Sequence, residues 1–186
     1  MEEKMDRRQR KTRNAIFSAF IELLSEKHYS NITVGEIIEK ADVGRATFYS
    51  HFETRDFLLK ALLDELFCHI FDSLNNSHNH KHIFDCNAPE SVFLHLIQHL
   101  KKNDNNILKL FTSKNNELFT EHFKTNLKKL VESQLDTFPN EKTKKLPKEL
   151  RITLISSAFA EIIKWWVKNG MKESEEELAE YFYMSI

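Results

Sequence analysis

The sequence contains few glycines and prolines, three of each, and this scarcity argues against an all-β fold with its many tight turns. Apolar residues make up 41% of the chain and charged residues 30%, a balance typical of globular proteins and not of disordered ones. The apolar residues recur at three- and four-residue spacings, which places them on one face of a helix. We therefore expect an all-α fold of about nine helices.

Cysteines and long apolar runs are also scarce. The two cysteines, Cys68 and Cys86, cannot build a disulfide framework. No run approaches the roughly 20 apolar residues that a membrane span requires, and no apolar export segment opens the chain. We expect a cytoplasmic protein with no membrane partner.

The usual catalytic motifs are missing from the sequence. It has no Gly-rich phosphate loop, no nucleophile elbow and no His-Glu-x-x-His motif, so we expect no enzyme and no cofactor. His78, His80 and His82 alternate along one segment, and His95 and His99 lie one turn apart on a predicted helix. Both spacings can hold a metal ion. Because no Cys/His cluster completes either set, we expect a solvated loop and a helix face, with no metal site.

The net charge of −1 does not point to a nucleic-acid binder, but the charge distribution is more informative. Five basic side chains fall within Arg7–Arg13, at the start of the first expected helix. A short basic arm of this kind can neutralise DNA phosphates although the whole chain is near neutral. A solvated helix start explains the same residues equally well.

Capping motifs and apolar spacing locate the helices. Thr33 and Glu36 fit a capping box, as do Ser174 and Glu177, and Gly170 suits a left-handed helix end. Segments 75–87 and 138–146 are predicted loops. The expected helices span residues 8–27, 33–40, 45–51, 55–75, 89–100, 106–112, 117–135 and 147–168, with a last helix after Ser174.

One segment carries the functional prediction: residues 33–52 read TVGEIIEKADVGRATFYSHF. The pattern predicts two short helices joined by a tight turn at Ala41–Gly44, with Phe48 among the apolar contacts between them. The outward face of the second helix offers a guanidinium, a hydroxyl, a phenol and an imidazole, from Arg45, Thr47, Tyr49 and His51. Such a row suits the DNA major groove and its flanking phosphates.

This segment resembles the DNA-binding region of the TetR family of bacterial regulators. The matching residues are Ile37, Ala41, Val43, Thr47, Tyr49, His51, Phe52 and Leu58. The resemblance covers about residues 8–62 and implies a helix-turn-helix domain over residues 1–53, followed by a larger helical domain for effector binding and dimerisation over residues 54–186. Asp42 stands where the family usually has Gly, at a turn position that we expect to be left-handed, and Asp tolerates that conformation better than most residues. Gly44 and Ala46 also depart from the family pattern, so the DNA sequence that this chain reads cannot be transferred from relatives.

The resemblance also implies specific DNA contacts. Thr33, Tyr49, His51 and Arg55 would contact phosphates, and Arg45 would contact base edges, with Ala46 or Thr47 as further candidates. Arginine to guanine is the commonest specific contact, which favours Arg45 as the base reader. A second phosphate contact for Arg45, and a packing role for Tyr49, remain open.

A dimer is expected, because one helix-turn-helix contacts too few base pairs to be specific, whereas two can bind a palindromic operator. The apolar residues of 150–168 cover more than one helical stripe, so one face needs a partner; a fully buried helix in a monomer is the alternative. The expected interface residues are Ile155, Phe159, Ile162, Trp166, Leu178 and Tyr181.

The family resemblance further implies an effector that releases the regulator, a repressor by family default, from its operator. Aromatic residues of the second domain could line its pocket, although aromatics at helical spacing also form ordinary cores. The candidates are Phe67, Phe71, Phe93, Phe111, Phe119, Phe123 and Trp165. A second possibility is that this domain binds a protein partner in place of a small molecule.

Overall fold

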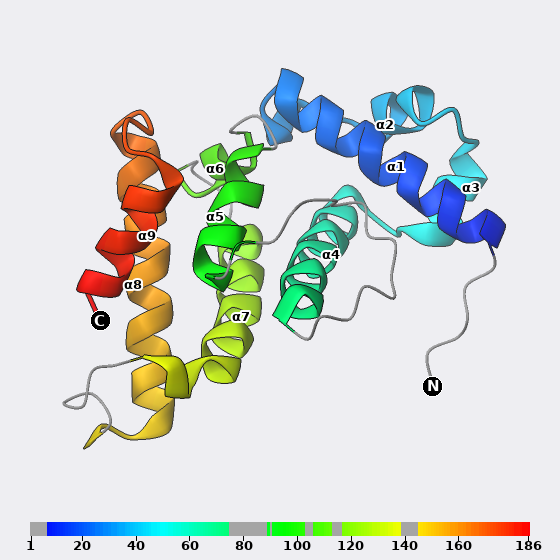
Figure 1. Cartoon of the computed structure of the whole chain (residues 1–186). Coiled ribbons are helices and arrows are strands. Elements are labelled where there is room, and N and C mark those ends of the chain that lie inside the picture. Colours follow the sequence, from blue (N-terminus) through cyan, green and yellow to red (C-terminus); the bar gives the residue numbers. More distant parts are fainter. Residues whose placement is uncertain (1–6, 75–88, 90, 103–105, 113–116, 139–144) are drawn as a thin grey trace.

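A computed structural model of the chain describes residues 7–74, 89, 91–102, 106–112, 117–138 and 145–186. These residues form nine α-helices and two short 3₁₀ turns, with no β-strand among them, so the all-α prediction is confirmed (Figure 1). The elements are α1 (Arg7–Glu26), η1 (Tyr29–Asn31), α2 (Val34–Lys40), α3 (Arg45–His51), α4 (Arg55–Leu74), α5 (Val92–Lys102), α6 (Asn106–Leu110), α7 (Glu117–Ser133), η2 (Leu135–Thr137), α8 (Lys148–Lys168) and α9 (Glu175–Met184).

Helices α1, α2 and α3 form one end of the molecule, and α8 and α9 lie at the other end (Figure 1). The expected capping box begins α2: Thr33 and Glu36 bond each other's backbone N–H groups, at 3.2 and 2.8 Å. Lys40 on α2 pairs with Glu22 and Glu26 on α1, at 2.7 and 2.6 Å. These contacts hold α2 against α1.

The turn between α2 and α3 departs from ordinary backbone geometry at one residue. Asp42 has a φ of 51°, the left-handed conformation that the sequence led us to expect. Asp tolerates this region better than most residues because its short polar side chain can bond locally. Gly44 then precedes α3 as N-cap, without a side-chain hydrogen bond to the helix start.

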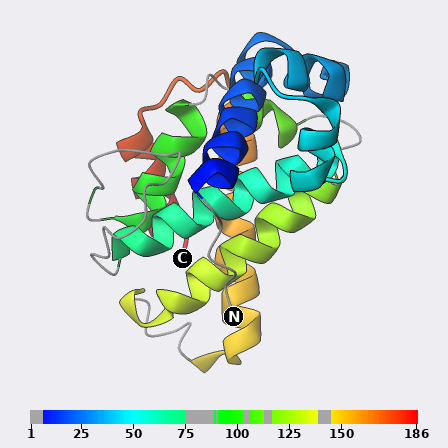
Figure 2. The same cartoon turned by 90° about the vertical axis from the view of Figure 1, so that its right-hand side faces the viewer.

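Helix α4 connects the three N-terminal helices to the rest of the chain. It packs along α7 and against α5 (Figure 2). Arg13 on α1 forms an ion pair with Glu65 on α4 at 3.3 Å. The buried apolar residues from α1 to α9 form a single cluster, which runs across the predicted domain boundary at residue 54 without a break.

Helices α8 and α9 form a hairpin with the helix end and start that the sequence predicted. Gly170 has a φ of 78° after the end of α8, and the Ser174–Glu177 capping box opens α9. The indole N–H of buried Trp166 donates to the carbonyl of Glu173 at 3.1 Å, which fixes the connection. Arg151, also buried, donates to the carbonyl of Leu135 at 2.8 Å.

Two local features differ from the sequence prediction. Helix α5 begins at Val92 and not at Pro89, because the Ser91 hydroxyl accepts a hydrogen bond from the Leu94 N–H at 3.2 Å and so caps the helix. The 3₁₀ turn η1 was not predicted, since three residues are too few to show a period. The predicted loop at 75–87 lies outside the described residues. Within the described part of the chain, no helix combines the length and apolar character needed to cross a membrane.

Candidate DNA-binding site

Helix α3 is a short helix with one buried anchor. Phe48 is fully buried and packs against Phe52, whose ring meets that of Phe17 on α1 edge-on at 5.3 Å. The rest of α3 faces outward. Its exposed residues are Arg45, Ala46, Thr47, Tyr49 and Ser50. A seven-residue helix is unstable in isolation, so the packing of Phe48 and Phe52 holds this polar row in place.

The exposed row has the chemistry that the sequence predicted. Arg45 and Thr47 are exposed, and 46% of Tyr49 is accessible while its ring packs edge-on against Phe48 at 5.5 Å. A guanidinium and a hydroxyl on one outward face can bond base edges or phosphates. Base reading by Arg45, with Ala46 or Thr47 beside it, therefore stays a prediction that this geometry permits.

Thr33 combines an exposed position with a structural role. Its hydroxyl accepts from the Glu36 N–H at 3.2 Å and lies 2.9 Å from Glu36 Oε2. Glu36 also bonds Lys27, and these hydrogen bonds lower the pKa of the Glu36 carboxyl to about 2. The start of α2 is thus fixed from two sides, and the predicted phosphate contact of Thr33 remains a prediction.

Arg55 is more deeply engaged within the protein than the sequence suggested. Its Nη1 donates to the carbonyls of Tyr29, Ser30 and Ile32, the first at 3.1 Å. Its guanidinium also lies over the Tyr29 ring, 4.2 Å from the centroid, and the Tyr29 hydroxyl donates to Asp56. Arg55 therefore holds η1 against the start of α4, and a phosphate contact would have to come from the rest of its guanidinium.

His51 and Arg13 lie together at the end of α3. Burial lowers the pKa of the half-buried His51, and the charge of Arg13 lowers it further, so both favour the neutral form of the ring. The Arg13 guanidinium lies over the rings of Phe17 and Phe52, at 4.8 and 5.1 Å. Arg13 is therefore a packing residue. The other basic residues of the arm, Arg7, Arg8, Arg10 and Lys11, are exposed.

The aromatic residues predicted to line a ligand pocket fall into separate groups in the structure. Three of them, Phe111, Phe119 and Phe123, pack on one another with centroids 4.7–6.1 Å apart, and Phe67 joins them at 5.4 Å from Phe123. A separate cluster surrounds Phe93, which contacts Phe138, Phe159 and Phe182. Phe71 is half-buried, and Trp165 is 44% exposed. Most of the set is closely packed core.

A cavity of about 400 Å³ lies between η1, α4 and α7. Its lining includes only Phe119 from the predicted aromatic set. The lining residues are His28, Tyr29, Ser30, Arg55, Asp56, Leu59, Lys60, Leu63, Leu118 and Phe119. Polar and charged side chains thus line the cavity beside apolar ones, where the sequence predicted aromatic residues, and the cavity adjoins the residues that join α4 to the N-terminal helices.

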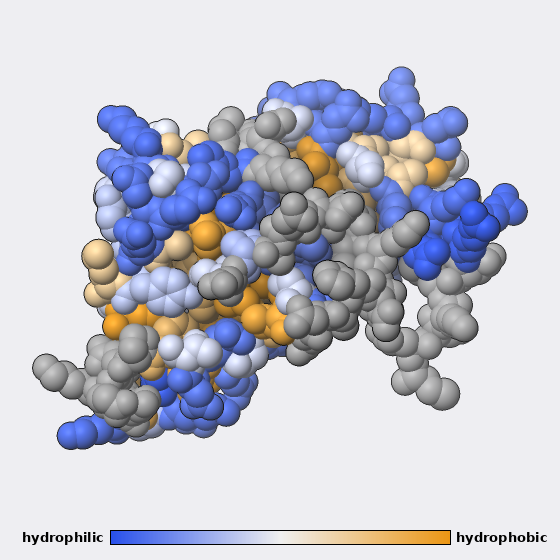
Figure 3. Space-filling view, viewed as in Figure 1, coloured by the Kyte–Doolittle hydropathy of each residue, from blue (hydrophilic) through white to orange (hydrophobic). Residues whose placement is uncertain are grey.

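The residues predicted for the dimer interface divide between core and surface. Ile155, Phe159, Trp166 and Leu178 are buried within the chain itself. Tyr181 is 41% exposed, and Ile162 is partly exposed. The exposed apolar side chains of α8 and α9 are instead Leu150, Leu154, Trp165, Tyr181, Tyr183 and Met184. Figure 3 shows apolar side chains interrupting the hydrophilic surface over this part of the molecule.

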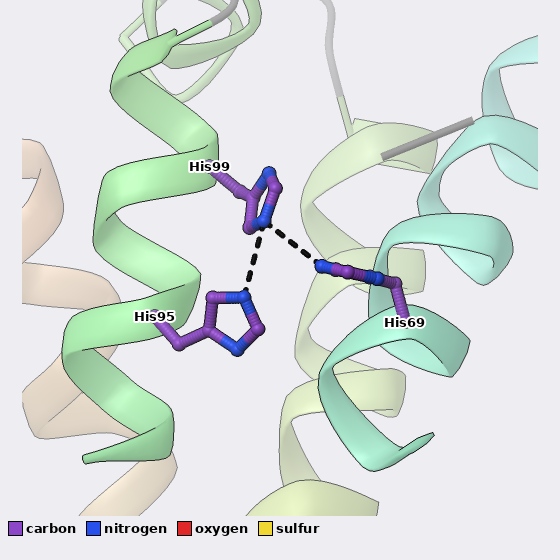
Figure 4. A group of neighbouring side chains, drawn as sticks. All are labelled: His69, His95 and His99. Carbon is purple, nitrogen blue, oxygen red and sulfur yellow. Dashed lines mark hydrogen bonds between the residues drawn. The ribbon is translucent and has the colours of Figure 1, made fainter. Parts of the chain in front are cut away.

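Three histidines meet at a place that the sequence did not predict. His95 and His99 on α5 face His69 on α4, and their rings point toward one another (Figure 4). The Nε2 atom of His99 lies 3.0 Å from that of His69 and 3.1 Å from that of His95. The spacing of His95 and His99 was visible in the sequence. His69 was missed because it comes from another helix.

Comparison with known proteins agrees with the all-helical fold. Residues 16–62 match the family model "Bacterial regulatory proteins, tetR family", and residues 87–186 match a "Transcriptional regulator C-terminal region" model of TetR proteins. A TetR transcriptional regulator from Streptococcus agalactiae 2603V is 32% identical, with 96% of this chain and 95% of that one covered and a TM-score of 0.67. The chain belongs to the TetR family of transcriptional regulators.

Two further similar proteins match either a part of the chain or the fold alone. The uncharacterized regulator YxbF of Bacillus subtilis is 38% identical over 74 residues, which is 39% of this chain but only 20% of that protein. The transcriptional regulator FadR from Bacillus subtilis, solved in complex with stearoyl-CoA, is 17% identical, with 92% of this chain and 98% of that one covered and a TM-score of 0.60. At this identity the likeness shows a shared fold.

Proposed function

We propose that this chain regulates transcription by reading a specific DNA sequence with α3. The observation that carries the proposal is the exposed row of Arg45, Thr47 and Tyr49 above a fully buried Phe48. The buried phenylalanine fixes the helix, so its polar face meets DNA without first having to be ordered. Arg45 bonds a guanine, while Thr33, Tyr49 and His51 contact phosphates. The exposed basic residues of Arg7–Lys11 add sequence-independent attraction.

The regulator acts as a homodimer in this proposal. Leu154, Ile162 and Trp165 follow one another along the outer side of α8, and Trp165 meets Tyr181 of α9 at 6.3 Å. Large apolar side chains grouped on a surface mark interaction sites. A second copy that places the same face against this one buries both sets around a two-fold axis. Two copies of α3 then reach two half-sites of a palindromic operator, as two-fold symmetry requires.

Binding of a ligand releases the regulator, acting as a repressor, from its operator. The cavity of about 400 Å³ falls within the size range of small-molecule sites. Its lining combines charged and apolar side chains, which favours an effector that has both a charged or hydrogen-bonding group and an apolar part. An occupant would contact Arg55 and Asp56, which hold η1 against α4, and could shift the N-terminal helices. It does so only if it binds the released and the bound conformations with different affinity. The chain works where DNA is accessible, in the cytoplasm.

A protein partner is the second candidate for the C-terminal region. The observation in its favour is the exposed pair Trp165 and Tyr181, since aromatic side chains are enriched at protein interfaces. The two possibilities are distinguished by the oligomeric state. If the purified chain is a dimer whose formation is abolished by Trp165→Glu, the aromatic pair is the dimer interface and is not available to another protein.

The experiment that tests the proposal selects bound duplexes from random DNA with the purified chain. We expect an enriched palindromic sequence, and metabolites can then be screened for release of that duplex. Enrichment of no sequence above the starting pool contradicts specific reading by α3. A matched control is Phe48→Ala. This variant keeps every exposed side chain of α3 but removes the buried ring that packs the helix against the protein, so it should abolish enrichment.

A further inference from the structure

The three histidines His69, His95 and His99 form a cluster whose chemistry the DNA-binding site does not use. The side chains of His95 and His99 are only 1% and 3% exposed, and His69 is half-buried. One nitrogen from each ring lies within 4.8 Å of the others. The ring centroids are 4.7–5.0 Å apart, and the rings are turned so that these nitrogens face a common point (Figure 4).

Proton placement at the cluster begins with Ser73 on α4. The Ser73 hydroxyl donates its one proton to the carbonyl of Ile70 at 2.6 Å. Its oxygen therefore accepts from Nδ1 of His95, which lies 3.2 Å away. A neutral imidazole ring carries a single proton, on one of its two nitrogens. Because that proton is on Nδ1, the Nε2 atom of His95 presents a lone pair to the cluster.

Hydrogen bonding alone does not suit the arrangement around His99. An imidazole nitrogen carries either one proton or one lone pair, and each points in a single direction in the ring plane. Nε2 of His99 nevertheless has two nitrogen neighbours, at 3.0 and 3.1 Å. If Nε2 of His99 carries a proton, it would have to share that proton between the other two nitrogens. If it carries a lone pair, that lone pair would have to accept two hydrogen bonds. Three lone pairs directed at one cation remove this conflict.

We propose that His69, His95 and His99 bind a divalent late first-row transition metal ion, with Zn²⁺ as the typical case. Zn–N bonds of about 2.0–2.1 Å place the nitrogens of a tetrahedral site about 3.3 Å apart. The two observed separations at His99 are a few tenths of an ångström shorter, and the ligand nitrogens of all three rings lie within 4.8 Å of one another, so ring rotations would have to make the three separations equal. Imidazole ligands favour Zn²⁺, Ni²⁺, Cu²⁺ or Co²⁺ over Mg²⁺ and Ca²⁺. The fourth coordination position is open to water or a small anion.

The ligands come from two helices with different connections. His95 and His99 lie on α5, and His69 lies on α4, whose first residue, Arg55, follows α3 closely in the chain. Fourteen residues separate Arg55 from His69, which is about 21 Å of helix. A metal ion that joins α4 to α5 therefore fixes the position of α4, the helix that directly follows the DNA-binding helix α3 in the chain. If the proposed function holds, the metal ion is an effector of the regulator.

Metal binding is tested first, without DNA. The full chain, freed of metal with a chelator, is titrated with Co²⁺ and followed by visible absorption, and Zn²⁺ is then added to displace Co²⁺. We expect one ion per chain, the intense bands of four-coordinate Co²⁺, and no competition from Mg²⁺. No binding, or only the weak bands of six-coordinate Co²⁺, overturns the proposal.

Variants then locate the site. We expect His99→Gln to weaken Co²⁺ binding at least about 100-fold, and Ser73→Ala to weaken it about 10-fold while the spectrum is kept, because Ser73 only orients His95. His122→Gln removes a histidine that bonds Asp64 outside the cluster and should change nothing. Circular dichroism of the metal-free variants checks folding. A folded His99→Gln with unchanged affinity overturns the assignment.

A further control addresses histidines elsewhere in the sequence. His78, His80 and His82 lie outside the described residues, and a variant with alanine at all three should bind Co²⁺ as the unaltered chain does. Loss of binding in this variant, together with retention in His99→Gln, overturns the assignment to α4 and α5.

The effector role is tested separately, from the affinity for the selected operator with and without Zn²⁺. An unchanged affinity rejects that role and leaves the metal site intact, and a failed DNA selection counts against the proposed function alone.

Discussion

Replacing Arg55 by alanine tests whether this residue stabilises the folded chain by holding η1 against α4. The guanidinium donates to three carbonyls at and beside η1 and covers the Tyr29 ring. Hydrogen bonds from charged groups contribute about 1.5–3 kcal/mol, and cation–π contacts add about 0.5–2 kcal/mol. Because the three bonds share one nitrogen and the site is partly exposed, we expect Arg55→Ala to lower the free energy of unfolding by about 2–4 kcal/mol.

The assay is urea denaturation followed by circular dichroism, with Arg55→Lys as the matched control. Lysine keeps the positive charge but lacks the planar guanidinium, so we expect it to recover less than half of the loss. A change below about 0.5 kcal/mol for Arg55→Ala, a value typical of surface positions, would refute the structural role. Full recovery with lysine would show that only the charge matters. The phosphate contact is measured separately, from the salt dependence of DNA binding, whose slope should fall by about 1 if Arg55 contacts a phosphate.

Three further predictions concern α2, the turn and the dimer. The Glu36 pKa is about 2 in the folded chain against an ordinary 4.5, so its contribution to stability is complete above pH 4.5 and lost as the pH falls toward 2; thermal melts of Glu36→Gln should show lower stability at pH 7 and a weaker decline on acidification. Asp42 has a positive φ, so Asp42→Gly should stabilise by about 0.5 kcal/mol and Asp42→Val destabilise by about 1–2 kcal/mol in urea titrations; the reverse order would contradict the assigned turn. Sedimentation at micromolar concentration should show a dimer that Leu154→Glu or Trp165→Glu converts to folded monomer, and a monomeric unaltered chain would exclude the proposed interface.

Local motifs made the N-terminal helices predictable from the sequence. The limits of α3 at Arg45 and His51, the capping box at Thr33 and the left-handed Asp42 were all expected and are all observed. Each depends on residues close together in the chain. A side-chain cap, a left-handed turn residue and one apolar contact per helical turn leave few alternatives for such a short segment.

The C-terminal region was less predictable, because its site residues depend on contacts between distant helices. On α8, one apolar stripe with Ile155 and Phe159 faces the core, while another with Leu154 and Trp165 faces outward. Hydrophobicity alone does not distinguish these two faces. The aromatic residues posed the same problem, since a packed core and a pocket wall have the same composition. We expected no metal site because only His95 and His99 are close together in the sequence. His69 lies on α4, and only the packing of α4 on α5 brings it to them.

In the proposed function, α3 reads a specific DNA sequence through Arg45. Its most direct test measures the affinity of the chain and of Arg45→Ala for the selected operator and for a scrambled duplex of equal length and composition. We expect the variant to lose about 1–3 kcal/mol of binding free energy on the operator and much less on the scrambled duplex. Equal losses on both duplexes would show that Arg45 binds a phosphate and would contradict its role as the base reader.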